Sequence, residues 1–502
     1  MRHKKYFIML FMLPLFIANM ATADNTPIQT VSRSFLEPFV GQYESGSITV
    51  TVILKGGTTL IFAVPGLRTF ELVYTQGLSF ELYTLSGNRI EFKKDASGAV
   101  IGLTAHLFNN TFIAKKKSDI PYPVVIVSPP NPAISKDYQG AYWSNEQLTA
   151  DYPLERIEVA GTYKQIGCML GQWYQAHGYV SQPFPPDIKE TARACYGLIE
   201  KIYPGMSEQM KGVYVSYGLN LSEMHMGIPV WEGLNFIGLL PGVSINKNKA
   251  GPGKDSCSNV FVRPEMNTDG HARFGRNHDW SYPMLHTALI FTFPDTAGYY
   301  PTLLMTGGAP GFAAVDGINS KGLAIGNASV YLPYQPSKEP ALIDFMALHL
   351  VLEKCANVAE AVALLRSIPV THLQAFTPSH FLITDRGGAS VVVEFLSTGI
   401  ECSITDAPFQ VMTNNYWAGP ANKDLCWRYN KAVSDLISKQ GQMDTDGMTA
   451  VMSSIRYSTQ WTIIYDLQDL SMILTLPNDN FKKQYKFFLA DFIARMEKRK
   501  KT

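Results

Sequence analysis

The order of strand-like and helix-like segments after residue 257 most constrains how this chain can fold. Apolar, strand-forming runs come first, two helical segments follow, and strands then return. This order predicts an α+β architecture in which two sheets are covered by outer helices. The predicted strands are Asn259–Val262, His271–Gly275, Leu289–Phe293, Thr302–Met305, Phe312–Asp316, Leu323–Ala328, His380–Thr384, Ala389–Phe395, Gly399–Ile404, Phe409–Thr413, Trp461–Asp466 and Ser471–Thr475, and the predicted helices are Ile343–Cys355, Val358–Ser367 and Leu425–Ser438.

A separate block at 35–117 contains many short strand-like runs divided by turn residues such as Gly56-Gly57 and Ser97-Gly98. Closely spaced strands of this kind predict a small all-β barrel or sandwich. Its opening, Phe39-Val40-Gly41-Gln42-Tyr43, resembles the lipocalin-like accessory domains of some bacterial serine hydrolases. The block contains no catalytic pattern, so a structural or docking role is expected.

Two further segments lie between this block and residue 257. Residues 118–138 hold five prolines and are expected to form a stiff, extended linker. Residues 139–256 are mainly helical by periodicity, with helices expected at Thr162–His177, Asp187–Ile202 and Ser207–Gly218. The glycine- and proline-rich stretch from Pro241 to Lys254 predicts an exposed loop just before Cys257.

The first 23 residues have the three parts of a cleavable signal peptide. A basic start is followed by an apolar run over Tyr6–Met20 and by the small residues Ala21-Thr22-Ala23. The apolar run is shorter than the roughly 20 residues of a spanning helix, although an uncleaved anchor is the alternative. The pattern predicts a secreted or periplasmic protein cut after Ala23, with no integral membrane segment once the signal is removed.

Charge and cysteine content exclude several classes of protein. The formal net charge of +1 gives no reason to expect nucleic acid or an anionic membrane as a partner. None of the six cysteines stands in a zinc-binding spacing, so we expect no metal and no cofactor. Oligomeric state and disulfide pairing stay open at this point.

The sequence around Cys257 makes it a candidate site residue. It begins a predicted strand after an exposed loop, which is a natural place for a scissile peptide bond. The motif Gly275-Arg276-Asn277-His278-Asp279-Trp280 follows about twenty residues later, so a simple hairpin returns an arginine and an aspartate to the cysteine. Arg276 can lower the pKa of the thiol, and Asp279 can hold an α-amine. Taken alone, the pair can equally be a structural salt bridge.

Four later segments follow these residues in the chain. The full set is Cys257-Ser258-Asn259-Val260 with 275–280, Asp316–Ala324 with Asn327, His380–Asp385 with Val391–Glu394, Val411-Met412-Thr413-Asn414-Asn415, and Ser454-Ile455-Arg456 with Thr459–Asp466. Together they are similar to the choloylglycine hydrolase and penicillin V acylase group, and to the related acyl-CoA:6-aminopenicillanate acyltransferases and acid ceramidases. Residues 158–167 also resemble the pro-segment of the acyltransferase branch.

The resemblance implies a four-layer αββα N-terminal-nucleophile hydrolase fold over 257–490. It implies cleavage between Ser256 and Cys257, after which the freed α-amine of Cys257 serves as base for its own thiol. The catalytic set that it implies is Cys257, Arg276, Asp279, Asn327, Asn414 and Arg456, with Asn327 and Asn414 as oxyanion donors.

Several of these assignments have an alternative. Asn327 can be a turn residue, Asn415 can replace Asn414, and Arg456 can simply pair with Asp466. His278 is expected to be a pocket or core residue, because the mechanism needs no histidine. We expect Asp316 and Asp385 to close turns, and an aromatic acyl pocket to form from Trp280, Tyr282, Phe312, Tyr331, Tyr416 and Trp417.

The leading hypothesis is a secreted linear-amide hydrolase that cleaves an N-acylated small molecule through a Cys257 acyl-thioester. An acyltransferase is the first alternative, because transfer and hydrolysis share these residues and differ in the acceptor. A non-catalytic secreted binding protein is the second. The intact set of candidate residues argues against it, since a decayed site should have lost some of them.

Overall fold

The computed structural model describes residues 31–501 in stretches broken by gaps. The gaps are 46–47, 56–58, 64–68, 83–84, 108–109, 120–140, 150–153, 178, 180, 184–185, 227–229, 231–256, 280–286, 308–309, 331–336, 373–377, 418–425 and 440–441. The predicted signal peptide, nearly all of the predicted linker, Ser256, Trp280, Tyr282 and Tyr331 therefore lie outside the described residues.

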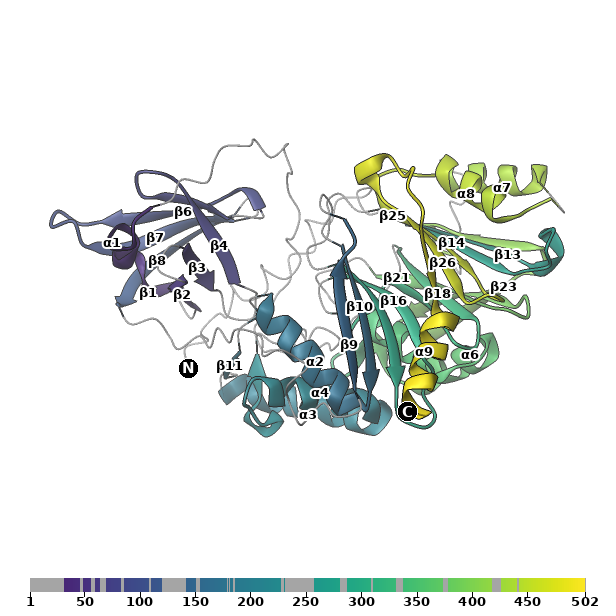
Figure 1. The fold of residues 1–502 in the computed structure, drawn as a ribbon, viewed down its shortest axis with the longest axis horizontal. Coiled ribbons are helices and arrows are strands. Elements are labelled where there is room, and N and C mark those ends of the chain that lie inside the picture. The colour runs from purple at the N-terminus through teal and green to yellow at the C-terminus, as the bar shows by residue number, and fades with distance from the viewer. Residues whose placement is uncertain are drawn as a thin grey trace.

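Eight consecutive strands form a closed barrel, which Figure 1 shows in purple. Each strand pairs antiparallel with the next, and β1 pairs with β8 to close the ring. Buried aromatic side chains, including Phe39, Phe80 and Phe92, fill the interior. The strands are β1 Gly41–Ser45, β2 Ile48–Lys55, β3 Thr59–Ala63, β4 Thr69–Gln76, β5 Ser79–Leu82, β6 Leu85–Lys94, β7 Val100–Leu107 and β8 Asn110–Ser118, preceded by helix α1, Arg33–Leu36.

A nine-stranded sheet carries half of the candidate site. Its strand order is β23-β22-β21-β18-β17-β16-β15-β10-β9, antiparallel except between β10 and β15. The strands are β9 Tyr142–Gln147, β10 Leu154–Gly161, β15 Thr287–Pro294, β16 Thr302–Gly307, β17 Asp316–Asn319, β18 Leu323–Ser329, β21 Ser379–Asp385, β22 Ser390–Leu396 and β23 Gly399–Ile404.

A six-stranded antiparallel sheet carries the other half. Its order is β24-β13-β14-β25-β26-β27. The strands are β13 Ser258–Val262, β14 Arg273–Asp279, β24 Phe409–Met412, β25 Thr459–Asp466, β26 Ser471–Thr475 and β27 Tyr485–Phe488, and two short pairs lie outside both large sheets: β11 Gln182–Pro183 with β12 His225–Met226, and β19 Leu342–Ile343 with β20 Val370–Thr371.

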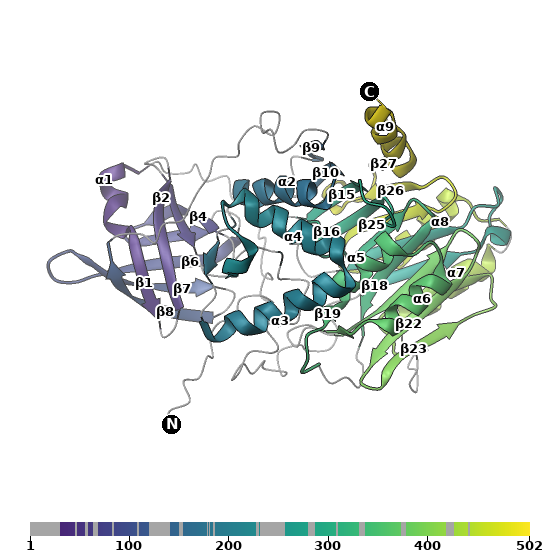
Figure 2. The ribbon, with the colours of Figure 1, turned by 90° about the horizontal axis from the view of Figure 1, so that it is seen from below.

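Three apolar cores join the two large sheets to each other and to the helices around them. One core joins the facing sides of the two large sheets, a second joins the nine-stranded sheet to α2–α6, and a third joins the six-stranded sheet to α7 and α8. Figure 2 shows α5 and α6 lying across the nine-stranded sheet. The helices are α2 Tyr163–Ala176, α3 Pro186–Ile202, α4 Pro204–Ser216, α5 Asp344–Lys354, α6 Val358–Ser367, α7 Trp427–Ser438, α8 Thr445–Ser454 and α9 Leu489–Lys501.

The segment before Cys257 contains strands as well as the predicted helices. It opens with β9 and β10, and β10 pairs over its whole length with β15, which follows Cys257 in the chain. Thr162 then starts α2 with a capping box, in which its hydroxyl accepts from the backbone of Gln165 and the Gln165 side chain accepts from the backbone of Thr162. The chain on both sides of residue 257 therefore builds one sheet.

Candidate active site around Cys257

Cys257 lies directly before β13 and is 5% exposed. In the β13–β14 hairpin Ser258 pairs with Asn277, so Arg276 and Asp279 at the end of β14 lie beside the cysteine. The hairpin predicted from the sequence is thereby confirmed. It places a thiol, a cation and a carboxylate at one end of the six-stranded sheet.

Arg276 links the two sheets beneath the thiol. Its side chain is fully buried, and its Nη2 lies 3.6 Å from the Cys257 Sγ and 2.7 Å from the Asn327 Oδ1. Its Nη1 donates to the carboxylate of Asp316 on β17, and Asp316 also accepts from the hydroxyl of Tyr465. A buried cation requires such a counter-charge. Asp316 is thus a buried ion-pair partner within a strand, and the expectation that it closes a turn is wrong.

A glycine on β18 makes room for this arrangement. A Cβ atom at Gly326 would lie 2.4 Å from the Oδ1 of Asn259, 2.9 Å from the ring of Phe274 and 3.1 Å from the Cδ of Arg276. Contacts this short would displace these side chains. Gly326 therefore lets the two sheets approach closely where Arg276 crosses between them.

Asp279 is a buried carboxylate whose two oxygens have different surroundings. Its Oδ1 accepts from the hydroxyl of Thr459, whereas its Oδ2 has no hydrogen-bond partner among the described residues. The nearest cation, Nη1 of Arg428, lies 3.5 Å from Oδ2. Burial raises the pKa of Asp279 from 3.8 to about 6, against the opposing effects of Thr459, Arg428 and Arg276. A donor that arrived at Oδ2 would relieve this cost.

The environment of the Cys257 thiol disfavours its ionised form. Burial raises the pKa of Cys257 above its ordinary value, Arg276 lowers it, and Asp279 raises it. The predicted effect of Arg276 is present, but burial outweighs it. A base that takes the thiol proton would therefore greatly accelerate its attack on a carbonyl carbon.

His278 is a buried neighbour of the thiol. Its Nδ1 lies 3.9 Å from the Cys257 Sγ, and its ring stacks on Trp461 with the centroids 3.9 Å apart. Arg276 approaches the same Nδ1 at 3.1 Å. Burial and then the charge of Arg276 hold the pKa of His278 well below its ordinary value. Its burial agrees with the prediction of a pocket or core residue.

The two candidate oxyanion donors come from elements of different sheets. Asn327 lies within β18 and not at a turn, and its bond to Arg276 uses the carbonyl oxygen, which leaves the amide nitrogen to donate. Asn414 belongs to residues 413–417, which follow β24 and are called the Asn414 loop below. Its Nδ2 donates to the carbonyl of Ser329, and its Oδ1 accepts from Arg428. The neighbouring Asn415 has a buried amide nitrogen without a partner among the described residues.

Arg428, which the sequence analysis did not single out, makes the contacts expected of a site arginine. It occupies the second position of α7, and its Nη1 donates to the carbonyl of Cys257 at 2.9 Å and to the Ser258 hydroxyl at 3.0 Å. The buried positions of α7 are Arg428, Ala432 and Leu436. A cation in an apolar stripe of i, i+4 spacing is unusual, and that pattern could have identified it.

The side chain of Arg456 makes its contacts with residues other than Cys257. Its Nε and Nη2 donate to the hydroxyls of Thr462 and Thr475, and its guanidinium lies 3.9 Å from the ring centroid of Phe481. Burial lowers its pKa while the charge of Asp279 raises it, so an electrostatic link to the site remains. Asp466, its alternative partner, instead contacts His271 and Arg273.

The predicted aromatic acyl pocket is only partly described. Phe312 is fully buried on the other side of the nine-stranded sheet, against Tyr174 of α2, so its assignment to the pocket is wrong. Tyr416 and Trp417 are half-buried on the Asn414 loop. These two remain candidates for contact with an acyl group.

Other candidate ligand sites lie away from Cys257. The potential metal ligands Asp269, His271 and Asp466 lie within 4.8 Å of one another, but Arg273 already forms ion pairs with both carboxylates. Asp385 accepts from Gly387 and Ala389 and closes a turn, as predicted. The six cysteines, all of which are among the described residues, form no disulfide with one another.

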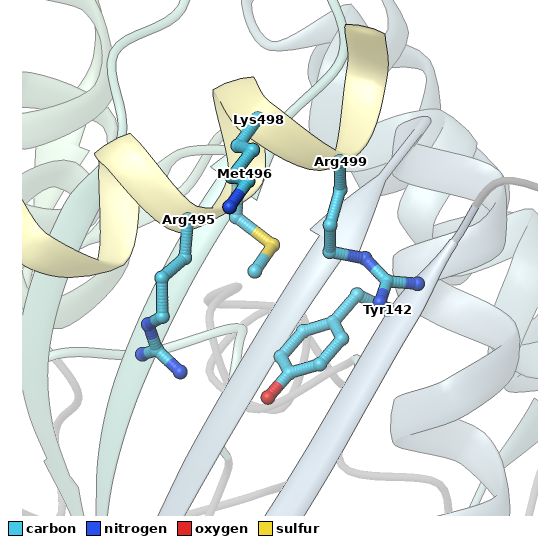
Figure 3. Close-up of a pocket in the computed structure, with 5 residues that line it drawn as sticks. All are labelled: Tyr142, Arg495, Met496, Lys498 and Arg499. Carbon is cyan, nitrogen blue, oxygen red and sulfur yellow. The ribbon is translucent and has the colours of Figure 1, made fainter. Parts of the chain in front are cut away.

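A pocket of about 320 Å³ lies beside α9, lined by Tyr142, Arg495, Met496, Lys498 and Arg499 (Figure 3). Tyr142 is paired to Ala160 at the end of the nine-stranded sheet opposite Asn327. This pocket therefore takes no part in the chemistry at Cys257.

Within the part of the chain that the structure describes, no helix combines the length and apolar character needed to cross a membrane.

Comparison with known families shows what the region after Cys257 is similar to. Residues 266–496 match the model of the family described as acyl-coenzyme A:6-aminopenicillanic acid acyl-transferase. Over these residues the chain is similar to this family. The resemblance inferred from the sequence motifs is confirmed, and with it the prediction of an enzyme of the N-terminal-nucleophile group of amidohydrolases and acyltransferases. The match to the acyl-transferase family begins after Cys257, so the cysteine itself is placed by the hairpin geometry.

Solved structures that align with part of this chain were also found. A mutant of the conjugated bile acid hydrolase from Clostridium perfringens aligns with a TM-score of 0.39 and 16% identity, over 47% of this chain and 93% of that one. Penicillin V acylase from Agrobacterium tumefaciens aligns with a TM-score of 0.35 and 18% identity, over 46% and 85%. No curated protein sequence matched the chain.

Proposed function

We propose that this chain is a self-processing linear-amide hydrolase in which Cys257 is the nucleophile. The observation that carries the proposal is the contact of the Cys257 thiol with the fully buried Arg276. Beside it lies a carboxylate oxygen of Asp279 that makes no hydrogen bond with the described residues and has Arg428 3.5 Å away. A purely structural cysteine would not need a compensated cation at this position. The two large sheets and their outer helices fit a four-layer αββα catalytic region.

Self-cleavage is the first step of the proposed mechanism. The Cys257 thiol attacks the carbonyl carbon of Ser256, the C–N bond breaks, and the thiol proton passes to the departing nitrogen. Water then hydrolyses the resulting thioester and leaves Ser256 with a carboxylate. The product is a Cys257 residue with a free α-amine, whose pKa near 7.7–8.0 in ordinary surroundings suits a base at neutral pH.

The freed amine then serves turnover. It takes the thiol proton, the thiolate attacks the amide carbonyl of the substrate, and the amine returns the proton to the leaving nitrogen. Asp279 would bind the ammonium through Oδ2, and Arg276 would stabilise the thiolate. The amide nitrogen of Asn327 and a donor from the Asn414 loop would stabilise the tetrahedral oxyanion, with roughly 3–4 kcal/mol for each well-placed donor.

Arg428 and Arg456 take separate roles in this proposal. Arg428 holds the carbonyl of Cys257 and lies near Asp279, so it fixes the nucleophile and offsets the carboxylate. Arg456 acts at longer range, by raising the local potential at Asp279. Water resolves the acyl-thioester and releases the acid.

Acyl transfer is the second candidate activity, and the matched family supports it by name. Transfer replaces the resolving water by an amine such as 6-aminopenicillanic acid and requires an acyl donor such as a coenzyme A thioester. The signal-peptide pattern over 1–23 favours hydrolysis, because an exported protein would rarely meet acyl-coenzyme A. We propose that the mature protein is secreted or periplasmic, with the barrel as an accessory β domain and a small N-acylated molecule as substrate.

The proposal is tested by trapping the acyl-enzyme. Purified protein is mixed with N-acyl 4-nitroanilides of increasing acyl length, quenched in acid and analysed by mass spectrometry, alongside Cys257→Ala. The expected result is release of 4-nitroaniline and a transient acyl adduct on the fragment that begins at Cys257, both absent from the variant. Adding 6-aminopenicillanic acid distinguishes transfer from hydrolysis by the appearance of an acylated amine. An adduct on another residue, or equal activity of the variant, would overturn the assignment.

A further inference from the structure

The Asn414 loop is fastened to the nine-stranded sheet through two of its backbone groups. The Nε2 of His380 lies 2.6 Å from the carbonyl oxygen of Thr413, and the backbone N–H of Trp417 donates to the Oε1 of Glu394 at 2.7 Å. A carbonyl oxygen only accepts, so the Nε2 of His380 carries a proton. The loop itself follows β24 of the other sheet, so these contacts join the two sheets at the site.

His380 and Glu394 form a matched pair on neighbouring strands. They are directly opposite each other in the β21–β22 ladder, and their Nδ1 and Oε1 atoms lie 3.2 Å apart. Both side chains are at most 1% exposed. Residues two positions away on each strand, Leu382 and Val392, belong to the core between the two sheets. Because side chains alternate along a strand, His380 and Glu394 also face the six-stranded sheet, which lets them reach the loop.

The loop connects this pair to the nucleophile. The side chain of Asn414 is held by Ser329 at 2.6 Å and by Arg428 at 2.8 Å, and Arg428 holds the carbonyl of Cys257 at 2.9 Å. A shift of the Asn414 loop therefore moves an oxyanion-donor candidate and the partner of the nucleophile together. Misplacement of a reacting group by about 1 Å can cost on the order of 10²-fold in rate.

We infer that His380 and Glu394 are positioning residues, which hold the Asn414 loop so that its donors meet the transition state; this rests on the proposed function. Stability alone does not account for the pair. A buried histidine–carboxylate pair contributes little to stability compared with apolar side chains of similar size, because removing its polar groups from water is costly. The pair does supply fixed acceptor and donor geometry to two loop backbone groups, which apolar side chains cannot do.

The test compares Glu394→Leu with Glu394→Gln and with a matched control, Glu353→Leu. Leucine removes the acceptor for Trp417 and His380, whereas glutamine keeps an acceptor oxygen at Oε1. Glu353 is an equally buried glutamate beside a histidine, His349, but it contacts Tyr163 on the helix side of the sheet. Active sites are titrated with iodoacetamide at Cys257, and kcat and KM are measured on a 4-nitroanilide that the wild type hydrolyses.

The expected result is a kcat for Glu394→Leu about tenfold to a hundredfold below the wild type, with KM within about twofold, and recovery of most of that loss in Glu394→Gln. Glu353→Leu should lower the melting temperature but leave kcat per active site unchanged. If Glu394→Leu does not accumulate as folded protein, His380→Leu makes the same test, because it removes the donor to Thr413.

Two outcomes would overturn the inference, and they are distinguishable. If the wild type cleaves itself and hydrolyses the substrate but Glu394→Leu keeps the wild-type kcat per active site, the positioning role is wrong and the proposed function stands. If the wild type neither cleaves itself nor turns over any anilide, the proposed function fails and the positioning role with it.

Discussion

The guanidinium of Arg428 donates to the carbonyl oxygen of Cys257 at 2.9 Å, which ties helix α7 to the residue that bears the thiol. The same side chain reaches Asn414 and lies near Asp279. One arginine thus connects the candidate nucleophile, the carboxylate beside it and a candidate oxyanion donor. Its position depends on the packing of α7 against β13 and β24.

Arg428→Lys tests this connection. Lysine keeps the positive charge but loses the planar fork that serves Cys257 and Asn414 at once. We expect kcat to fall by about tenfold to a hundredfold, with a smaller change in KM, measured per titrated active site. Arg273→Lys is the matched control, because Arg273 is an equally buried arginine on β14 that pairs with Asp269 and Asp466 away from the thiol. Equal kcat values for the two variants would contradict the assignment.

Gly326→Ala should damage both folding and activity. The added Cβ would lie 2.4 Å from the Asn259 Oδ1 and 3.1 Å from the Cδ of Arg276, so the sheets must separate or Arg276 must move. We expect a loss of about 1–3 kcal/mol in the free energy of unfolding, measured by urea denaturation, and a lower kcat. Gly197→Ala on α3, where a Cβ meets nothing within 4 Å, should instead be neutral or stabilising. A Gly326→Ala variant with wild-type stability and kcat would show that the close approach is not required.

Asp279 should make the stability of the uncut chain depend on pH. Its pKa is raised to about 6 in the folded chain from 3.8, so the folded state binds its proton more tightly than the unfolded state. The resulting stabilisation is complete below about pH 4 and is lost as the pH rises through about 6, a change of about 3 kcal/mol. The measurement is urea unfolding of Cys257→Ala across this range.

The comparison variant for that titration is Cys257→Ala with Asp279→Asn, which cannot ionise at this position. Its stability should lack the fall that the aspartate produces between about pH 4 and 6. Parallel stability profiles for the two proteins would mean that Asp279 is not perturbed. In the cleaved enzyme, the new ammonium group of Cys257 should lower the pKa of Asp279, because an opposite charge favours the carboxylate.

Phe312→Ala should affect stability without affecting substrate preference. Phe312 is fully buried beside Tyr174 on the helix side of the nine-stranded sheet. Truncation of such a side chain costs about 3–5 kcal/mol. Kinetics across the series of acyl lengths should match the wild type after correction for the folded fraction. A selective loss for long acyl chains would return Phe312 to the acyl pocket.

Most helices and strands after residue 257 could be predicted, because each one depends on the pattern of apolar residues within its own short segment. The bounds expected for Val358–Ser367, Gly399–Ile404 and Ser471–Thr475 agree with α6, β23 and β26. Helices α8 and α9 and strands β9, β10 and β27 were not predicted. The strand expected at Phe312–Asp316 begins only at Asp316. β10 could not be foreseen in the sheet because its parallel partner, β15, lies beyond residue 257.

Some contacts of the candidate site could also be predicted from the sequence, and others could not. Arg276 and Asp279 could be predicted, since a hairpin brings the end of β14 back to Cys257. The role of Asp316 as counter-charge to Arg276 and the contacts of Arg428 arise from packing between distant elements, which spacing along the chain does not encode. Packing between distant elements also decides the contacts of Arg456. This arginine matches a family motif, whereas Arg428 does not. Its side chain nevertheless contacts Thr462, Thr475 and Phe481 and not Cys257.

The central claim is that the chain cuts itself before Cys257, and intact-mass analysis of the purified protein beside Cys257→Ala tests it most directly. We expect two fragments for the wild type, the larger with Cys257 as its first residue, and a single uncut chain for the variant. A single uncut chain in both proteins would contradict it, because the α-amine that serves as base would then remain an amide.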